Sequence, residues 1–237
     1  MKSADIIFLI DATGSMSTGI EAVKMHIEHF VDSLEHPTDA CDMPVTDWRV
    51  AICAYRDYEY DTENGVAWFI QNSFTRDLNA LKRQLDGIHA EGGGDEPESL
   101  LDAIWRIGKI SEMDNCVVKA NDEDADKWRH HSRAARFVIV LTDASFHVNV
   151  PSAPGITMED VMEVIESARL RLSIYAPEFP NFSGYDELSQ CSYAEYFPFP
   201  NETNPVDSLV SFVSNDANFR EVLQKRSANI CHVCSHC

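Results

Sequence analysis

The chain has 237 residues, of which 44% are apolar and 24% charged, and these totals fit one globular α/β domain with a short appendage. The formal charge of −20 argues against nucleic-acid binding, because an acidic surface repels phosphates and releases no counterions. The seven cysteines are an odd number, and three lie within the last seven residues, so we interpret them as reduced thiols, some of them on metal, and not as a disulfide framework. No apolar run approaches the roughly 18 residues of a membrane span, and the first residues lead into a strand without a signal peptide, so we expect a cytoplasmic protein with no membrane contact.

Segments with the hydrophobic pattern of strands alternate with segments that have the pattern of helices. A continuous apolar run at residues 5–10 is typical of a strand covered on both faces, and apolar residues recur at helical spacing over residues 17–34. The strands that we expect lie at residues 5–10, 48–55, 66–70, 136–142, 170–175 and 193–197. The helices that we expect lie at residues 17–34, 78–88, 97–107, 158–168, 185–191 and 206–226, with Pro97 in the first turn of the third.

This alternation predicts a Rossmann-like, doubly wound sheet of six strands, mostly parallel, with helices on both faces. A turn at residues 61–65 predicts that the second and third strands form a hairpin, which makes the third strand an antiparallel edge. The polar residues 111–132 indicate a solvated loop. We expect one domain over residues 1–228 and a separate Cys/His-rich tail over residues 229–237.

Acidic residues follow two of the predicted strands and the glycine run at residues 92–94. Asp11 comes after the first strand, Asp143 after the fourth, and Asp95 and Glu98 after the glycines. In sheets of this kind, ligands bind beyond the carboxyl ends of the strands near a switch in strand order. We therefore expect these carboxylates to lie close together.

Two hydroxyl side chains accompany the first of these carboxylates. Asp11, Thr13 and Ser15 alternate along the chain, and Gly14 allows a sharp turn between them. Carboxylate and hydroxyl oxygens suit a hard divalent cation such as Mg²⁺, or Mn²⁺ or Ca²⁺ in its place. Helix capping is the alternative interpretation for Thr13 and Ser15.

The pattern Asp11-x-Thr13-x-Ser15 resembles the metal-ion-dependent adhesion site (MIDAS) of von Willebrand factor A (VWA) domains. The segments Asp-Ala-Thr-Gly-Ser-Met and Gly-Gly-Gly-Asp-Glu-Pro-Glu are similar to the branch found in hemicentins and in domains attached to some alpha-kinases. The resemblance implies a cation at the carboxyl-terminal rim of the sheet, which accepts a Glu or Asp carboxylate from a partner protein. It also implies that Asp143 contacts the ion through water; a turn or N-cap role is the alternative.

The second motif departs from many relatives, which have a threonine ligand after the glycines. Here Asp95 stands at that position by the glycine alignment, whereas comparison with the I-like domain of integrin β chains makes Glu98 the ligand. Both assignments stay open, and a first-turn carboxylate favoured by the helix dipole is a third possibility for Glu98. A carboxylate ligand should tighten the ion and weaken its attraction for a partner's carboxylate.

Asp57 and His147 are candidates for the rim of the same site. Asp57 follows the second predicted strand and either supports the rim or pairs with Arg56. His147 lies four residues after Asp143 and could contact a ligand, although a surface histidine is the more ordinary interpretation.

The last seven residues offer a different set of ligands. Cys231, Cys234 and Cys237 could bind Zn²⁺ together with His232 or His236, since the Cys-x-x-Cys spacing lets two thiolates hold one tetrahedral ion. A zinc ion shared with a partner or a second copy and a loose tail are the alternatives.

The function that we expect is a metal-dependent protein-binding module that acts as an intracellular scaffold or recruiter. The alternative is a metal-dependent hydrolase or phosphatase that recruits Asp57, Asp95 and His147, and a third is a metal-free scaffold. No Walker loop, nucleophile elbow or His-Glu-x-x-His motif occurs in the sequence, so we expect no enzyme activity.

Overall fold

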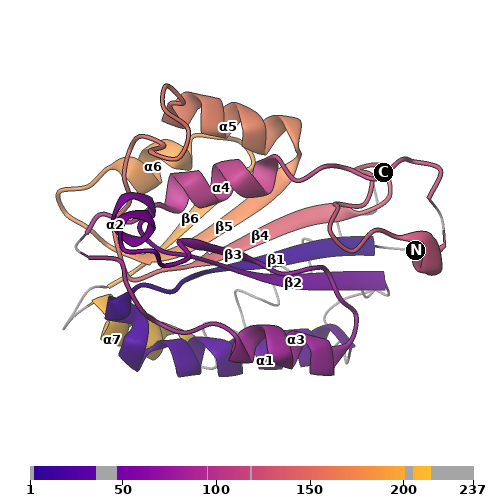
Figure 1. The fold of residues 1–237 in the computed structure, drawn as a ribbon, viewed down its shortest axis with the longest axis horizontal. Coiled ribbons are helices and arrows are strands. Elements are labelled where there is room, and N and C mark those ends of the chain that lie inside the picture. The colour runs from indigo at the N-terminus through magenta and orange to yellow at the C-terminus, as the bar shows by residue number, and fades with distance from the viewer. Residues whose placement is uncertain (1–2, 36–46, 95, 118, 201–204, 215–237) are drawn as a thin grey trace.

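A computed structural model describes most of the chain as one sheet between two layers of helices (Figure 1). The described residues are 3–35, 47–94, 96–117, 119–200 and 205–214. The strands are β1 (Ser3–Asp11), β2 (Asp47–Tyr55), β3 (Phe69–Gln71), β4 (Ala135–Leu141), β5 (Leu170–Pro177) and β6 (Ala194–Phe199). The α-helices are α1 (Ile20–Glu35), α2 (Tyr58–Glu63), α3 (Leu78–Asp86), α4 (Leu100–Gly108), α5 (Met158–Ser167), α6 (Gly184–Leu188) and α7 (Pro205–Ser214), and two short 3₁₀ segments are η1 (Gly14–Thr18) and η2 (Ala120–Asp122). Among these described helices, none is long and apolar enough to cross a membrane.

The sheet has the strand order β3-β2-β1-β4-β5-β6. Every neighbouring pair is parallel except β2 and β3, which are antiparallel. Helices α1, α3 and α7 cover one face, and α4, α5 and α6 lie on the other (Figure 1). The prediction of a mostly parallel α/β sheet with one antiparallel edge strand is confirmed. The chain leaves β1 toward β2 and later returns to β4 on its other side, so the switch in strand order lies between β1 and β4.

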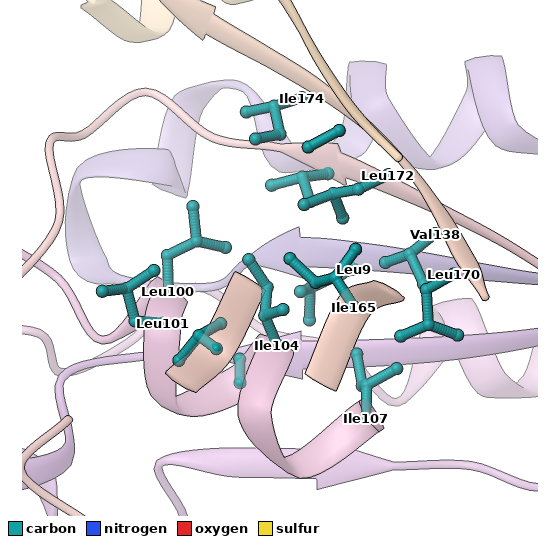
Figure 2. Packing of buried hydrophobic residues seen from close by; sticks show 14 of the residues in the cluster. Leu9, Leu100, Leu101, Ile104, Ile107, Val138, Ile165, Leu170, Leu172 and Ile174 are labelled. Carbon is teal, nitrogen blue, oxygen red and sulfur yellow. The ribbon is translucent and has the colours of Figure 1, made fainter. Parts of the chain in front are cut away.

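Strand β1 is buried on both faces, which explains its continuous apolar run. Its residues belong alternately to two cores: Phe8 packs in the layer with α1 and α3, and Leu9 packs in the layer with α4 and α5. Figure 2 shows Leu9 among side chains from α4 and α5, including Ile104 and Ile165. Burying a side chain of this size stabilises the fold by roughly 1.5–3 kcal/mol. Because β1 and its neighbour β4 both contribute such side chains to the two cores, the ends of these strands are held in fixed positions.

Two local predictions differ from the structure because capping residues decide where short helices begin. Residues 58–63 form helix α2, where we expected only a turn, because the Asp57 carboxylate accepts a hydrogen bond from the Tyr60 amide at 2.6 Å and caps it. Pro97 does not lie in the first turn of α4, which begins at Leu100 after the N-cap position Ser99. Glu98 therefore precedes the helix, and the helix-dipole interpretation of its position is wrong.

The segment 111–132 is more firmly anchored than the solvated loop we expected. Trp128 is fully buried, and Arg129 is 5% exposed and donates from Nε to Asp5 at 2.8 Å. Arg49 binds the other oxygen of the same carboxylate at 2.7 Å. Asp5 is itself fully buried, and a buried charge needs such partners. The sequence pattern hid this anchor, since its acidic partner lies more than 120 residues away.

Several predictions concern residues outside the described part of the chain. These are the closing helix beyond Ser214, the domain boundary at residue 228, Asp95, Cys41 and the whole Cys/His tail. Within the described part, Cys53 and Cys191 are buried, Cys116 is exposed, and all three are free thiols.

Candidate metal centre

Asp11 and Thr142 meet at the switch point in strand order. Ile10 pairs with Leu141 in the register of β1 and β4, so the next residue of each strand also faces its neighbour. The Thr142 hydroxyl donates to Asp11 Oδ2 at 2.6 Å, and the Thr13 hydroxyl and amide donate to Oδ1 at 2.7 and 3.0 Å. Asp11 is fully buried, so these bonds fix its carboxylate below the rim of the sheet.

The hydroxyls of Thr13 and Ser15 lie beside each other between two carboxylates. Thr13 Oγ1 donates to Asp11, Ser15 Oγ donates to Asp143 Oδ1 at 3.1 Å, and the two hydroxyl oxygens are 3.1 Å apart. A hydroxyl has one proton, and an ionised carboxylate only accepts. When both protons point to the carboxylates, the two hydroxyl oxygens turn lone pairs toward each other. A cation between them would convert this unfavourable contact into two metal bonds.

The glycine loop 92–94 lies against this cluster and leaves no room for side chains. All three glycines have positive φ, between 64° and 85°, which other residues rarely adopt. A Cβ on Gly93 would lie 2.7 Å from the Thr13 side chain and 3.0 Å from Glu98 Oε1. Asp61 holds the loop by accepting from the Gly93 amide at 3.1 Å. Thr13 and Glu98 therefore both approach the loop at Gly93.

Glu98 is 4% exposed and is placed by backbone contacts with the segment after β4. Its amide donates to the Ser145 carbonyl at 3.0 Å, and its carbonyl accepts from the His147 amide at 2.9 Å. Its buried Oε2 has no hydrogen-bond partner among the described residues. A buried carboxylate oxygen without a partner is costly, and a cation or a water bound to it would remove that cost.

The carboxylates raise one another's pKa values. Burial, followed by repulsion from Asp11, Asp57 and Asp143, raises the pKa of Glu98 to about 10. Burial and the charge of Asp11 raise the pKa of Asp143 to about 7. Burial also raises the pKa of Asp11, although hydrogen bonds from Thr142 and Thr13 oppose the shift. A divalent cation would reverse these shifts, because it stabilises the ionised forms.

Asp57 and His147 lie together at the edge of this cluster. His147 Nε2 is 2.8 Å from Asp57 Oδ2, and the same oxygen is 3.5 Å from the Ser99 hydroxyl. Among the described residues Asp57 forms no ion pair with Arg56, which was one of our two predictions for it, and support of the rim stays a prediction. Arg56 is engaged elsewhere: it donates to the carbonyls of Ala12 and His89 at 3.0 and 2.7 Å.

The arrangement fits a hard cation held partly by neutral oxygens. Among the described residues, the carboxylates of Asp11, Glu98 and Asp143 do not form a set within 4.8 Å of one another, so the hydroxyls between them matter for any ion held there. Thr13 and Ser15 are 3.1 Å apart, close to the roughly 3.0 Å between neighbouring ligands around Mg²⁺ at about 2.1 Å. Around these hydroxyls, Asp11 and Asp143 lie one hydrogen bond away, and Glu98 approaches the adjoining loop at Gly93.

Sequence reasoning missed two residues that build this site. Thr142 positions Asp11 from the neighbouring strand, and its signal was its place directly before Asp143. Asp61 positions the glycine loop, and no sequence signal links it to Gly93, since 32 residues separate them.

Comparison with known proteins supports the fold and leaves the chemistry open. No family model and no curated protein matches the sequence. Among the solved structures, 174 chains match. Proximal thread matrix protein 1 from the mussel byssus aligns with a TM-score of 0.55 at 12% identity, covering 95% of this chain and 46% of that one, so this chain spans about half of its length. The SpRpn10 VWA domain aligns with a TM-score of 0.53 at 10% identity, covering 87% of this chain and 93% of that one.

Identities this low carry information about architecture only. The match to the SpRpn10 VWA domain extends over nearly the whole of that domain, and the mostly parallel six-stranded sheet with its antiparallel edge agrees with the expectation from the sequence. The described chain therefore has a VWA-like α/β fold.

Proposed function

We propose that this protein is a metal-dependent protein-binding module. A divalent cation, Mg²⁺ or else Mn²⁺ or Ca²⁺, binds at the carboxyl-terminal rim of the sheet to Thr13, Ser15 and one carboxylate of the second motif. Asp11 and Asp143 orient the hydroxyls and neutralise the ion. The ion then accepts a Glu or Asp side chain of a partner, and the protein acts as an intracellular scaffold or recruiter.

The contact between the two hydroxyl oxygens carries this proposal. The oxygens of Thr13 and Ser15 are 3.1 Å apart, and each has an acidic hydrogen-bond acceptor on its far side. Helix capping does not account for this arrangement, since Thr13 makes no side-chain capping bond to η1. The buried Oε2 of Glu98, which has no hydrogen-bond partner among the described residues, supports it independently.

An open coordination position is what allows such an ion to recruit a partner. Ser15 is exposed, whereas Thr13 is 1% exposed, so solvent and a partner reach the ion from the side of Ser15. Displacing one bound water by a carboxylate adds a charge-assisted bond. If Glu98 is ionised on the metal, its charge reduces the attraction for the partner, so we expect modest partner affinity.

Calorimetric titration of Mg²⁺ and of Mn²⁺ into the full chain tests the metal site. Ser15→Ala is the decisive variant, because its side chain is exposed and its loss should not disturb the core. We expect the wild type to bind one ion and Ser15→Ala to bind at least about tenfold more weakly, which corresponds to about 1.4 kcal/mol. Ser192→Ala, at an exposed position before β6 that belongs to neither proposed metal site, is the matched control and should bind like the wild type. Absence of binding by the wild type would remove the proposal.

Pull-down experiments test the partner chemistry. Partners retained by the wild type should be lost with a chelator and with Ser15→Ala, and they should be displaced by a peptide rich in glutamate but not by its glutamine counterpart. A partner that stays bound in the presence of chelator would contradict recruitment through the ion.

The contact between Asp57 and His147 is the one observation that favours hydrolysis as a second function. A histidine oriented by a carboxylate could serve as a base beside a metal-bound water. We propose binding in preference, because among the described residues no Lys or Arg side chain forms an ion pair with Asp11, Glu98 or Asp143 that could stabilise a transferred phosphate. Mn²⁺-dependent hydrolysis of p-nitrophenyl phosphate by the wild type that is lost in His147→Ala would reverse this preference.

The zinc assignment for Cys231, Cys234, Cys237 and the two tail histidines stays a prediction, as does the resemblance to the hemicentin branch.

A further inference from the structure

Two histidines and a glutamate come together at the end of the sheet opposite the candidate metal centre. Glu112 lies between α4 and β4, and His130 and His131 lie shortly before β4 begins at Ala135. The ligand atoms of these three residues lie within 4.8 Å of one another, and they form the one such set of His, Cys, Asp and Glu in the described part of the chain. Asp143 follows the other end of β4, so the two places are separated by the length of a seven-residue strand, about 20 Å.

The imidazole nitrogens face one carboxylate. His130 Nε2 is 3.1 Å from Glu112 Oε1, and His131 Nδ1 is 3.1 Å from Oε2 and 3.3 Å from Oε1. The two rings are stacked, with centroids 4.3 Å apart and planes 30° from parallel. The side chains of Glu112, His130 and His131 are 30%, 21% and 35% exposed. An ion bound to their three ligand atoms would therefore keep a coordination position open to solvent.

The backbone around the cluster is fixed by contacts that do not involve the cluster itself. The fully buried Trp128 precedes the histidines, and its amide and carbonyl bond to the segment of Glu112, with Ser111 at 3.0 Å and Met113 at 2.8 Å. Arg129, the residue between Trp128 and His130, is held by the buried carboxylate of Asp5. The ligands therefore stand on an ordered scaffold, and little conformational entropy is lost when they bind an ion.

Two neighbouring residues contact the proposed ligands: Ser132 lies against His130, and Arg136 competes with a metal ion for Glu112. Ser132 faces the other nitrogen of His130: its amide donates to Nδ1 at 3.2 Å, and its hydroxyl oxygen is 2.8 Å from the same atom. When Nε2 binds a metal, the ring proton moves to Nδ1, and the contact with the Ser132 amide gives way to a hydrogen bond from Nδ1 to Ser132 Oγ. Arg136 donates to Glu112 Oε2 and leaves Oε1 toward His130. The guanidinium balances the carboxylate charge, so the site attracts a metal through its imidazoles, and its affinity should be moderate.

We propose that Glu112, His130 and His131 form a second, independent metal site for a divalent ion that favours imidazole, with Zn²⁺ as the representative member. Two neutral imidazoles and one carboxylate are a ligand set that zinc takes in proteins, with water as the fourth ligand. Mg²⁺ favours oxygen ligands and does not compete well for it. The site is separate from the cation of the proposed function and does not depend on it.

A zinc titration in the presence of excess Mg²⁺ tests this site. The protein is the full chain with Cys231, Cys234 and Cys237 changed to serine and His232 and His236 changed to alanine, so that the tail cannot bind the probe. We expect one equivalent of Zn²⁺ to bind, detected by calorimetry, and Co²⁺ in its place to give the visible absorption of a low-coordinate site.

Single variants then assign the ligands. His130→Ala and His131→Ala should each weaken Zn²⁺ binding by on the order of a hundredfold, because loss of a direct ligand costs at least as much as loss of an outer partner, about 10–100-fold. His89→Ala, at another exposed histidine, is the matched control and should bind like the unmodified background. Circular dichroism confirms that each variant is folded. If His130→Ala is not folded, the Zn²⁺ affinity of His131→Ala alone decides whether the site exists. The proposal is overturned if the tail-substituted chain binds no Zn²⁺, or if its binding is the same in the His131→Ala variant; the three side chains then form only an ion-pair cluster.

Discussion

Replacing Glu98 by glutamine should have opposite effects on the metal-free and the metal-bound protein. In the metal-free fold, Glu98 is buried among like charges, and its pKa is raised from 4.5 to about 10. A carboxyl group with a raised folded-state pKa stabilises the fold fully below its unfolded pKa, and this contribution is lost as the pH rises toward the folded pKa. At pH 7.5 the solution is about 3 pH units above the unfolded-state pKa of 4.5. At about 1.4 kcal/mol per unit, the free energy of unfolding is therefore lowered by at most roughly 4 kcal/mol.

Glu98→Gln removes the titrating group and keeps the shape of the side chain. Part of the gain is offset, because the glutamine amide also lacks a buried partner, at a cost of about 1–3 kcal/mol. We therefore expect the metal-free variant to be more stable than the wild type at pH 7.5 by about 1–3 kcal/mol, or roughly 2–12 °C in Tm for a chain of this size. Near pH 5 the charge contribution falls to at most about 0.7 kcal/mol while the cost of the unpartnered amide remains, so the variant should be less stable than the wild type there by up to about 2 kcal/mol.

Saturating Mg²⁺ should reverse the order of the two proteins. A ligand at 100 times its Kd stabilises the native state by about 2.7 kcal/mol, and the variant should lose most of this gain because a carboxylate near the ion is gone. Thermal unfolding of each protein at pH 5 and at pH 7.5, with and without Mg²⁺, gives the four melting temperatures that this comparison needs. Glu63→Gln, at an exposed position on α2, is the control and should change none of them. A metal-free variant that is less stable than the wild type at both pH values would refute the charge argument, and an unchanged Mg²⁺ response would remove Glu98 from the metal site.

Two further substitutions test the supports of the site. Gly93→Ala should lower stability by more than 1 kcal/mol in urea unfolding and weaken Mg²⁺ binding, because its φ is 85° and the new Cβ would lie 2.7 Å from the Thr13 side chain. Gly155→Ala separates strain from crowding, since Gly155 has a φ of 95° and open space around it; equal losses in the two variants would contradict the packing argument. Thr142→Val should cost about 1–3 kcal/mol at neutral pH, because Asp11 loses a 2.6 Å hydrogen bond in a buried place, and the loss should shrink in acid as that carboxyl is protonated. A loss independent of pH would show that Thr142 acts by packing and not through the charge.

The sequence alone was enough to predict the mostly parallel sheet and the strand ends at which the candidate site residues Asp11 and Asp143 lie. The apolar run of β1 and the helical spacing that follows it are local patterns, and the rule that parallel strands end at one edge turned them into a prediction for Asp11 and Asp143. The hydroxyls of Thr13 and Ser15 were identified for the same reason, since their spacing to Asp11 is local. A fold similar to that of the SpRpn10 VWA domain can be expected from such patterns at only 10% identity, because burial on both faces of a strand constrains residue type and not identity.

The tertiary structure decided everything that depends on contacts across long separations. It brought Thr142 to Asp11 across 131 residues and Asp61 to Gly93 across 32, and it moved Glu98 out of the helix that the sequence suggested. It also gathered Glu112 with His130 and His131, residues that carried no motif, because the buried pairing of Asp5 and Arg129 fixes the backbone beside them. A hydrogen bond or an ion pair between distant residues leaves no period in a sequence, since only the folded chain brings its two partners within reach.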